Sequence, residues 1–347
     1  MYNIFIEKFK ESPTWADFER IYLKAHNDGI NSNTPITLVA DEEIWNFIIS
    51  SVQSTIKTPV FILTATSDRA SELAKELNLF SNDLKIFLYP SYGSRISLKN
   101  ISHNSEILNL RLKILRQITD YDKTKKPFII IATANSVMDK IPDDKILKEN
   151  SISFLLNEKY DRDGIINSLR SVGYERVNKV FDKGEFSVRG DILDIFDVAS
   201  ENPVRIDFDE NIVSKIFNYD INTNAVLNKI KNITVYPSLN NHNLKNQDLF
   251  NFNLTIGEEF GKMVSIFDYM DENIKKYCFI VCDPIEVKLK LKSDFDLLVK
   301  SSDSDIKSYS DNLIENDNFI KNSEFNDYIK KGFLNPDFLD TVTIKKG

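Results

Sequence analysis

The sequence has few cysteines, few histidines and no long apolar run, and each shortage excludes a class of protein. Its 347 residues include only two cysteines and three histidines. Cys278 and Cys282 lie in the apolar stretch Tyr-Cys-Phe-Ile-Val-Cys-Asp, which predicts two buried thiols. His26, His103 and His242 are scattered in polar contexts, where surface positions are expected. Neither a metal site nor a cofactor is therefore expected.

The lack of long apolar segments and the negative net charge restrict the class of protein further. No segment is long and apolar enough to predict a transmembrane helix, and residues 1–10 do not form a signal peptide. A cytoplasmic monomer without membrane contact is therefore expected. A net charge of -8 does not suit nucleic-acid binding by the whole chain, because neutralising phosphates needs a basic surface. The acidic balance favours a module that binds protein.

Short apolar strands alternate with helices through the first part of the chain. Residues 1–35 are expected to form an amphipathic helical segment, and residues 36–147 the first part of an α/β domain. The strands expected there are 36–39, 60–63, 85–88 and 128–132. The helices expected between them are 42–54, 68–77 and 106–118. This order indicates a mostly parallel, doubly wound sheet.

The alternation changes at about residue 148. Residues 148–237 are predicted to form an α+β module, with a strand at 151–156, a helix at 161–171 and mostly strands after it. The α/β pattern then resumes over residues 238–300, with a helix at 268–276, a strand at 277–282 and a helix at 285–299. Residues 301–347 are expected to be a polar linker, over 301–330, followed by a short element at 334–344. The expected architecture is one α/β domain interrupted by a β-rich module.

Residues 184–208 of that module predict two β segments, because apolar and polar side chains alternate along them. The apolar face is expected to hold Phe186, Val188, Val204, Ile206 and Phe208. The solvent face is expected to hold Ser187, Arg189, Arg205, Asp207 and Asp209. Arginines on such a face suit recognition of a planar anionic group. On periodicity alone the alternative is solvated pairs, Arg189 with Asp191 and Arg205 with Asp207 or Asp209, worth about 0–1 kcal/mol each. Gly184 and Gly190 bracket the first strand as expected turn residues.

The same segments resemble a known family. The sequences Gly-Tyr-Glu-Arg-Val (173–177), Gly-Glu-Phe-Ser-Val-Arg-Gly-Asp-Ile-Leu-Asp-Ile-Phe (184–196) and Pro-Val-Arg-Ile-Asp-Phe (203–208) are similar to a module shared by UvrB and the transcription-repair coupling factors, Mfd. In both families this module binds the excinuclease subunit UvrA. Weaker similarity extends from about Ile36 to Val281.

The resemblance implies a set of UvrA-binding residues, and the chain departs from the family at one of them and at one further position. The implied set is Arg176, Arg189, Arg205, Phe208 and Asp209. Ser187 stands where UvrB typically has a further arginine. Asp209 stands where Mfd proteins typically have the second residue of an aromatic pair, so a hot-spot anchor is missing. Binding that is weaker, or adapted to a co-varied partner, is expected.

The resemblance also implies a helicase-like, P-loop NTPase-type domain, but here in degenerate form. The predicted strand 36–39 is followed by Ala-Asp-Glu-Glu-Ile-Trp (40–45), which has no glycine, lysine or hydroxyl to bind phosphate. Asp41 and the two glutamates are expected to cap the next helix instead. Gly261-Lys262 lacks the upstream spacing of a phosphate loop. Asp283, followed by a proline, is expected to be a turn residue.

The DNA-separating hairpin of UvrB is also not expected. Residues 89–93, Tyr-Pro-Ser-Tyr-Gly, predict a surface loop with one buried aromatic residue. We therefore expect a non-catalytic N-terminal module of Mfd that recruits UvrA in nucleotide excision repair. RNA polymerase and DNA would be contacted only through parts outside this chain, which would be a fragment or a shortened relative. The alternatives are a UvrB-like DNA-binding ATPase and a regulatory relative that no longer binds UvrA.

Overall fold

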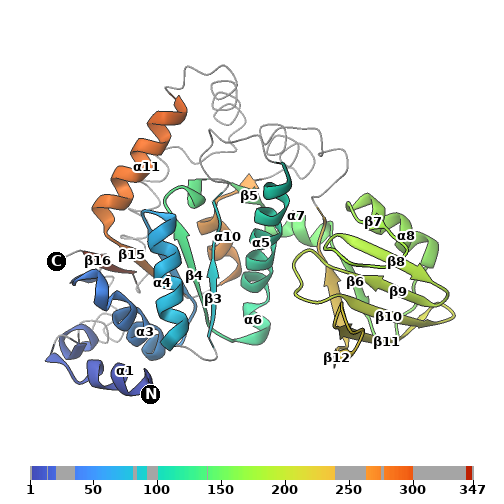
Figure 1. The fold of residues 1–347 in the computed structure, drawn as a ribbon, viewed down its shortest axis with the longest axis horizontal. Coiled ribbons are helices and arrows are strands. Elements are labelled where there is room, and N and C mark those ends of the chain that lie inside the picture. Colours follow the sequence, from blue (N-terminus) through green and yellow to red (C-terminus); the bar gives the residue numbers. More distant parts are fainter. Residues whose placement is uncertain are drawn as a thin grey trace. The chain divides into compact units, whose positions relative to one another are not determined.

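The chain forms two compact units (Figure 1). The computed structural model describes residues 2–13, 15–20, 36–80, 84–91, 101–138, 140–238, 263–274, 277–299 and 341–345. The first unit comprises residues 1–96, 118–141 and 264–347, and the second comprises 97–117 and 142–263. Several expectations lie outside the described residues, among them the linker 301–330, the Gly261-Lys262 pair, and His26 and His242.

The first unit is built on a parallel sheet with the strand order β1-β16-β15-β2-β4-β3. Its strands are β1 (Ile36–Val39), β2 (Val60–Thr64), β3 (Lys85–Leu88), β4 (Phe128–Thr133), β15 (Cys278–Cys282) and β16 (Thr341–Lys345). Every pairing in this order is parallel. The prediction of an α/β fold with a parallel sheet is confirmed.

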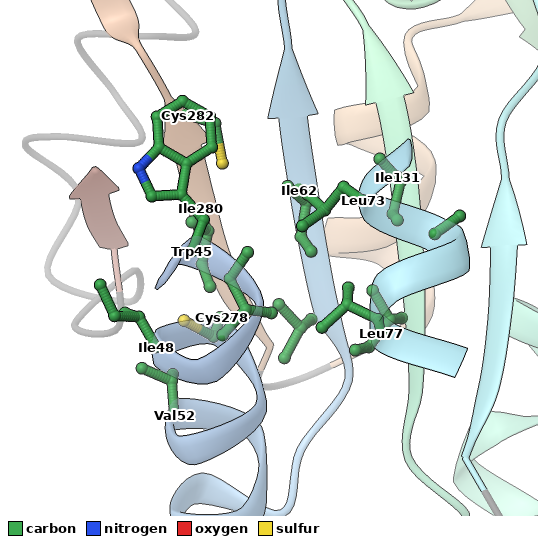
Figure 2. Packing of buried hydrophobic residues seen from close by; sticks show 14 of the residues in the cluster. Trp45, Ile48, Val52, Ile62, Leu73, Leu77, Ile131, Cys278, Ile280 and Cys282 are labelled. Carbon is green, nitrogen blue, oxygen red and sulfur yellow. The ribbon is translucent and has the colours of Figure 1, made fainter. Parts of the chain in front are cut away.

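Helices cover both faces of this sheet. They are α1 (Tyr2–Lys10), η1 (Glu42–Ile44), α3 (Trp45–Ile56), α4 (Ser67–Phe80), α6 (Tyr121–Thr124), η2 (Ser136–Met138), α10 (Ile266–Asn273) and α11 (Pro284–Val299). Ile62 of β2 packs in one core cluster with residues of α3 and α4 (Figure 2). Its neighbour Phe61 instead lies 5.5 Å, ring to ring, from Phe267 of α10. Because successive strand residues point to opposite faces, α3 and α10 lie on opposite sides of the sheet.

Strand β16 overlaps residues 334–344, for which the sequence predicts only a short element. The structure inserts it between β1 and β15, with Val342 in register with both Ile36 and Ile280. At the other end of the chain, helical residues 2–10 and 15–20 agree with the expected helical segment. Trp15 and Phe18 there are buried, with ring centroids 4.9 Å apart. Tyr89 is the expected buried aromatic residue of its loop, and the loop continues outside the described residues.

The second unit is built on a mostly antiparallel sheet with the order β12-β11-β10-β9-β8-β7. Its strands are β7 (Glu175–Arg176), β8 (Glu185–Arg189), β9 (Ile192–Ile195), β10 (Val204–Asp209), β11 (Ile212–Tyr219) and β12 (Val226–Lys229). The unit also contains the antiparallel pair β6 (Ile152–Leu155) and β13 (Asn232–Val235), with helices α7 (Asp144–Glu149) and α8 (Arg162–Ser171). Asp161 caps α8 by accepting a hydrogen bond from the amide of Gly164. The short strands β5 (Ile141–Pro142) and β14 (Met263–Val264) fall where the chain passes from one unit to the other.

Helix α5 (Ile101–Thr119) was expected to belong to the α/β domain, but most of it groups with the second unit. Two ion pairs connect it to the loop after β9. Lys113 Nζ lies 2.9 Å from Glu201 Oε1, and Arg116 Nη1 lies 2.8 Å from Asp197 Oδ2. The side chain of Asp197 is fully buried and also accepts hydrogen bonds from the hydroxyl of Tyr174 and the amide of Tyr236. This carboxylate therefore fixes the end of α5 to the β-rich part of the unit.

Candidate protein-interaction face

A turn at Gly190 brings three charged side chains of the second unit to the same side of its sheet. Gly190 has a φ of 55°, a left-handed conformation that favours glycine, and it joins β8 to β9 in a tight hairpin. In the resulting register Ser187 and Arg205 lie on either side of Asp194. We use the name arginine face for the side chains that share this side of the sheet. They are Glu185, Ser187, Arg189, Ile192, Asp194, Arg205, Asp207, Lys215, Phe217 and Tyr219.

Asp194 lies at the centre of the arginine face and binds both arginines. Its carboxylate accepts hydrogen bonds from Arg205 Nε at 2.6 Å and Arg205 Nη2 at 2.9 Å, and from Arg189 Nη2 at 2.8 Å. The Asp194 side chain is 2% exposed, whereas those of Arg205 and Arg189 are 20% and 52% exposed. Two cations share one buried carboxylate, so these three residues carry a net positive charge and Arg189 presents it to solvent.

The salt-bridge partners expected from periodicity are wrong. Asp191 pairs with Arg162 of α8 at 2.8 Å, and Asp207 pairs with Lys215 at 3.7 Å. Asp194 lies directly across from Arg205, closer than a residue two positions along the same strand, and it lies diagonally from Arg189, within reach of a long side chain. Asp194 therefore binds both arginines, although sequence spacing favoured other acids.

Tyr219 extends the face beside Arg205. The Arg205 guanidinium carbon lies 4.8 Å from the centroid of the Tyr219 ring, which is the geometry of a cation–π contact. Burial, followed by the charge of Asp194, raises the pKa of Tyr219 to about 12. The hydrogen bonds to Asp194 raise the pKa of Arg205. Arg205 is therefore held between a carboxylate and an aromatic ring, and its position on the sheet is restricted.

The remaining residues of the implied set do not join this cluster. Phe208 is 6% exposed and lies beneath Arg162, whose guanidinium carbon is 5.8 Å from the ring centroid. The expectation that Phe208 offers a contact surface is corrected, because its alternation on β10 turns the ring into the core. Asp209 is exposed at the end of β10. Arg176 is exposed on the edge strand β7, but it is in register with Phe186 and therefore belongs to the opposite side of the sheet.

Ser187 is another correction to the expected solvent face. The residue is buried, and its hydroxyl oxygen has no hydrogen-bond partner among the described residues. This position of β8 is therefore not accessible from solvent. Sequence reasoning missed Asp194, Arg162 and Tyr219. A signal for Asp194 was present, since it is the one charged residue in Ile-Leu-Asp-Ile, a segment otherwise suited to a buried strand.

In open α/β sheets nucleotides bind at the carboxyl ends of the strands, and in the first unit bulky side chains lie at the end of β1. Trp45 is buried there, and its indole nitrogen donates to the carbonyl of Ala40 at 3.1 Å. The guanidinium of Arg69 lies 5.0 Å from the Trp45 ring centroid and donates to the carbonyl of Glu42 at 2.9 Å. Trp45 belongs to the same core cluster as Cys282, at the end of β15 (Figure 2). A bulky indole and an ion-paired arginine thus occupy the end of β1.

Two expectations for turn residues in this unit have different outcomes. Asp41 precedes η1 but makes no side-chain capping hydrogen bond, so the expected capping role is wrong for this residue. The reason is that the first turn is a short 3-10 helix, and α3 begins only at Trp45. Asp283 is confirmed as a turn residue, with a φ of 49° and a side chain that accepts from the amide of Glu286 at 3.2 Å.

Both cysteines are buried as expected, and burial raises the pKa of Cys282 to about 12. Within the described part of the chain, no group of three or more His, Cys, Asp or Glu side chains is arranged to hold a metal ion. None of the described helices is long and apolar enough to cross a membrane.

Comparison with known proteins identifies the class of the second unit. Residues 152–240 match the UvrB interaction domain, which includes every strand of the arginine face. The chain is 25% identical over 189 residues to the transcription-repair-coupling factor of Bacillus subtilis, and 30% identical over 203 residues to that of Borreliella burgdorferi. It is 27% identical over 205 residues to the UvrABC system protein B of Clostridium botulinum.

These alignments cover 54%, 56% and 55% of this chain, and 16%, 17% and 30% of the respective relatives. The chain therefore spans less than a third of the length of these curated relatives. Over about half of its length it is related to the transcription-repair-coupling factors and UvrB, and it carries their UvrB interaction domain. The resemblance read from residues 173–208 is confirmed.

Proposed function

We propose that this chain is a non-catalytic module that recruits UvrA through the arginine face of its second unit, in the manner of a transcription-repair coupling factor. The observation that carries the proposal is the pair of arginines organised by the buried Asp194 within the UvrB interaction domain. The resemblance implies that Arg189 and Arg205 occupy positions that the family uses to contact UvrA. An arginine fixed on a rigid sheet recognises a carboxylate with little loss of side-chain entropy.

The two arginines have different roles in this proposal. Arg189 is half exposed and bonded to Asp194 through one nitrogen, so it contacts the partner directly. Arg205 is mostly buried and binds Asp194 through two nitrogens, so it holds the carboxylate in place. Asp194 is a positioning residue. It orients Arg189 and keeps the excess positive charge at one point of the face.

The first unit is proposed to be a degenerate helicase-like domain that neither binds nor hydrolyses ATP. Phosphate binding at a helix start requires free backbone amides and a favourable charge. Here residues 40–45 contain acids where a phosphate loop has glycines, and Trp45 packs against the end of β1. Titration calorimetry with Mg-ATP is expected to give no binding. A micromolar affinity would overturn the non-catalytic assignment.

The direct test is the affinity of the chain for UvrA of the same organism, measured by titration calorimetry or biolayer interferometry. Arg189→Ala is expected to cost about 1–3 kcal/mol of binding free energy, as for a charged residue at the centre of an interface. Arg170→Ala is the matched control, because Arg170 is an exposed arginine in the last turn of α8. Asp209→Phe is expected to strengthen binding by restoring an outward aromatic residue at the end of β10.

Folding is checked for each variant by circular dichroism before affinity is compared. If Arg189→Ala binds UvrA as tightly as the unmodified chain, the arginine face is not the contact surface. If the unmodified chain does not bind UvrA at all, the alternative of a regulatory relative that no longer binds UvrA replaces this proposal.

A further inference from the structure

An exposed aromatic residue lies in the loop that leads into β8. Phe181 is 61% exposed, in the segment between β7 and β8. Its neighbour Val180 is 1% exposed and packs inward. An exposed phenylalanine in a loose loop would be unremarkable, since single apolar residues are common on protein surfaces. The question is therefore whether the backbone holds this ring outward.

Hydrogen bonds hold the chain at Phe181 and over the three residues that follow it. The Glu185 carboxylate accepts from the amide of Phe181 at 2.7 Å and from the amide of Asp182 at 2.9 Å. The Lys183 ammonium donates to the carbonyl of Val198 at 3.2 Å, and the amide of Gly184 donates to the carbonyl of Phe196 at 2.8 Å. Val180 is buried, and the amides of Phe181 and Asp182 are both bound to the Glu185 carboxylate. The conformation of the loop therefore keeps the Phe181 side chain exposed.

The loop reaches the sheet from the side of the arginine face. Along β8, Glu185 alternates with the buried Phe186, and so it projects to the same side as Ser187 and Arg189. Because the Glu185 carboxylate binds the amides of residues 181 and 182, this part of the loop lies on that side. Lys179 adds a cation above the ring, with its nitrogen 5.0 Å from the Phe181 centroid.

We infer that Phe181 is an aromatic anchor of the same interface and inserts into an apolar pocket of UvrA. The inference rests on the proposed function. The partner is taken to be UvrA because Glu185, which binds the amide of Phe181, lies on the same strand and the same side of the sheet as Arg189. The complementary UvrA surface is an apolar pocket bordered by carboxylates, which would meet Lys179 and Arg189. Phe181 supplies the outward aromatic group that Asp209 does not, and aromatic residues and arginine are the types enriched at interface cores.

The experiment measures UvrA affinity for Phe181→Ala, Phe181→Leu and Lys179→Ala in the full chain. Phe181→Ala is expected to weaken binding about tenfold, the effect of losing a buried aromatic anchor. Phe181→Leu is expected to lose less, because it keeps part of the apolar contact, and Lys179→Ala about twofold. Leu289→Ala is the matched control, since Leu289 is a similarly exposed apolar residue on α11 of the first unit. It is expected to leave UvrA affinity unchanged.

The outcomes separate this inference from the proposed function. Loss of affinity in Arg189→Ala with none in Phe181→Ala would overturn the anchor and leave the arginine face standing. No binding by the unmodified chain would overturn both. Sedimentation velocity at the same concentrations tests the alternative that the Phe181 ring contacts a second copy of the chain. A dimer that Phe181→Ala dissociates, with UvrA affinity unchanged, would assign Phe181 to self-association and refute its role as an anchor.

Discussion

Replacing Arg205 with alanine should destabilise the second unit, whereas replacing Arg189 should barely do so. The sequence alone treats the two residues alike, as exposed arginines whose loss leaves the fold intact. The structure separates them by burial and by the number of hydrogen bonds to Asp194. Arg205 donates twice, at 2.6 Å and 2.9 Å, and is 20% exposed. Arg189 donates once, at 2.8 Å, and is 52% exposed.

The magnitude follows from what each substitution leaves behind. Without Arg205, Asp194 keeps its place in the core but retains one hydrogen bond to a half-exposed arginine. Breaking a fully buried ion pair costs about 3–5 kcal/mol. Because Arg189 still compensates and Arg205 is not fully buried, we expect a loss of about 2–3 kcal/mol, including the contact with Tyr219. Without Arg189 the loss is that of a solvent-screened pair, about 0–1 kcal/mol.

Urea unfolding of the full chain provides the assay, with far-UV circular dichroism and hydrogen exchange at the amides of β10 reporting on the second unit. Both tryptophans of the chain, Trp15 and Trp45, lie in the first unit. Their fluorescence is therefore an internal control that should not change in either variant. A double-mutant cycle with Asp194→Ala should give a larger coupling energy for Arg205 than for Arg189. Equal losses in the two single variants, or a larger one for Arg189, would refute the assignment of a structural role to Arg205.

Two further predictions concern the same unit. Gly173 and Gly190 both have a positive φ, but only at Gly173 would an added Cβ lie 1.9 Å from the carbonyl oxygen of Ser238. In urea unfolding, Gly173→Ala should therefore cost more than about 3 kcal/mol of stability, and Gly190→Ala about 1–2 kcal/mol. Equal costs would contradict the close approach. The second prediction concerns Tyr219, whose pKa is raised to about 12, so that the folded state binds the phenol proton more tightly than the unfolded state does. The resulting contribution to the free energy of unfolding is present below pH 10 and is lost between pH 10 and 12. Tyr219→Phe should flatten that alkaline decline, and an unchanged profile would exclude the contribution.

Much of the first unit could be predicted because its strands are short, continuous apolar runs. β2, β4 and β15 are buried along their whole length, and such runs between helices are typical of a parallel sheet. The place of β16 could not be predicted in the same way. Its residues are separated from β15 by a long polar stretch, and local periodicity does not say which strands a segment pairs with. Only the register of Val342 with Ile36 and Ile280 shows that it lies inside the sheet.

The side of the sheet on which Arg189 and Arg205 lie could be predicted from the sequence, but their ion-pair partner could not. Alternation along β8 and β10 correctly separated Arg189 and Arg205 from Phe186 and Ile206. The partner of the arginines depends on the register of β9 with its two neighbours, which places Asp194 directly opposite Arg205 and diagonally from Arg189. Phe181 was missed for a related reason. The exposure of a loop residue depends on its neighbours' hydrogen bonds, and the acceptor Glu185 lies in the next strand.

The burial of Asp194 favours one of the two interpretations of the arginine face, namely recognition residues over solvated ion pairs. A solvated acid between two arginines would form weak, exchanging pairs, and the arginines would then be ordinary surface residues. A carboxylate that is 2% exposed cannot exchange its partners for water, so it needs both arginines to remain where they are. Arg205 is therefore held in place because it compensates the buried charge of Asp194. It binds both carboxylate oxygens of Asp194 and shares Oδ2 with Arg189. Arg189 is thereby oriented towards solvent before any partner arrives, which is the property that a recognition residue requires.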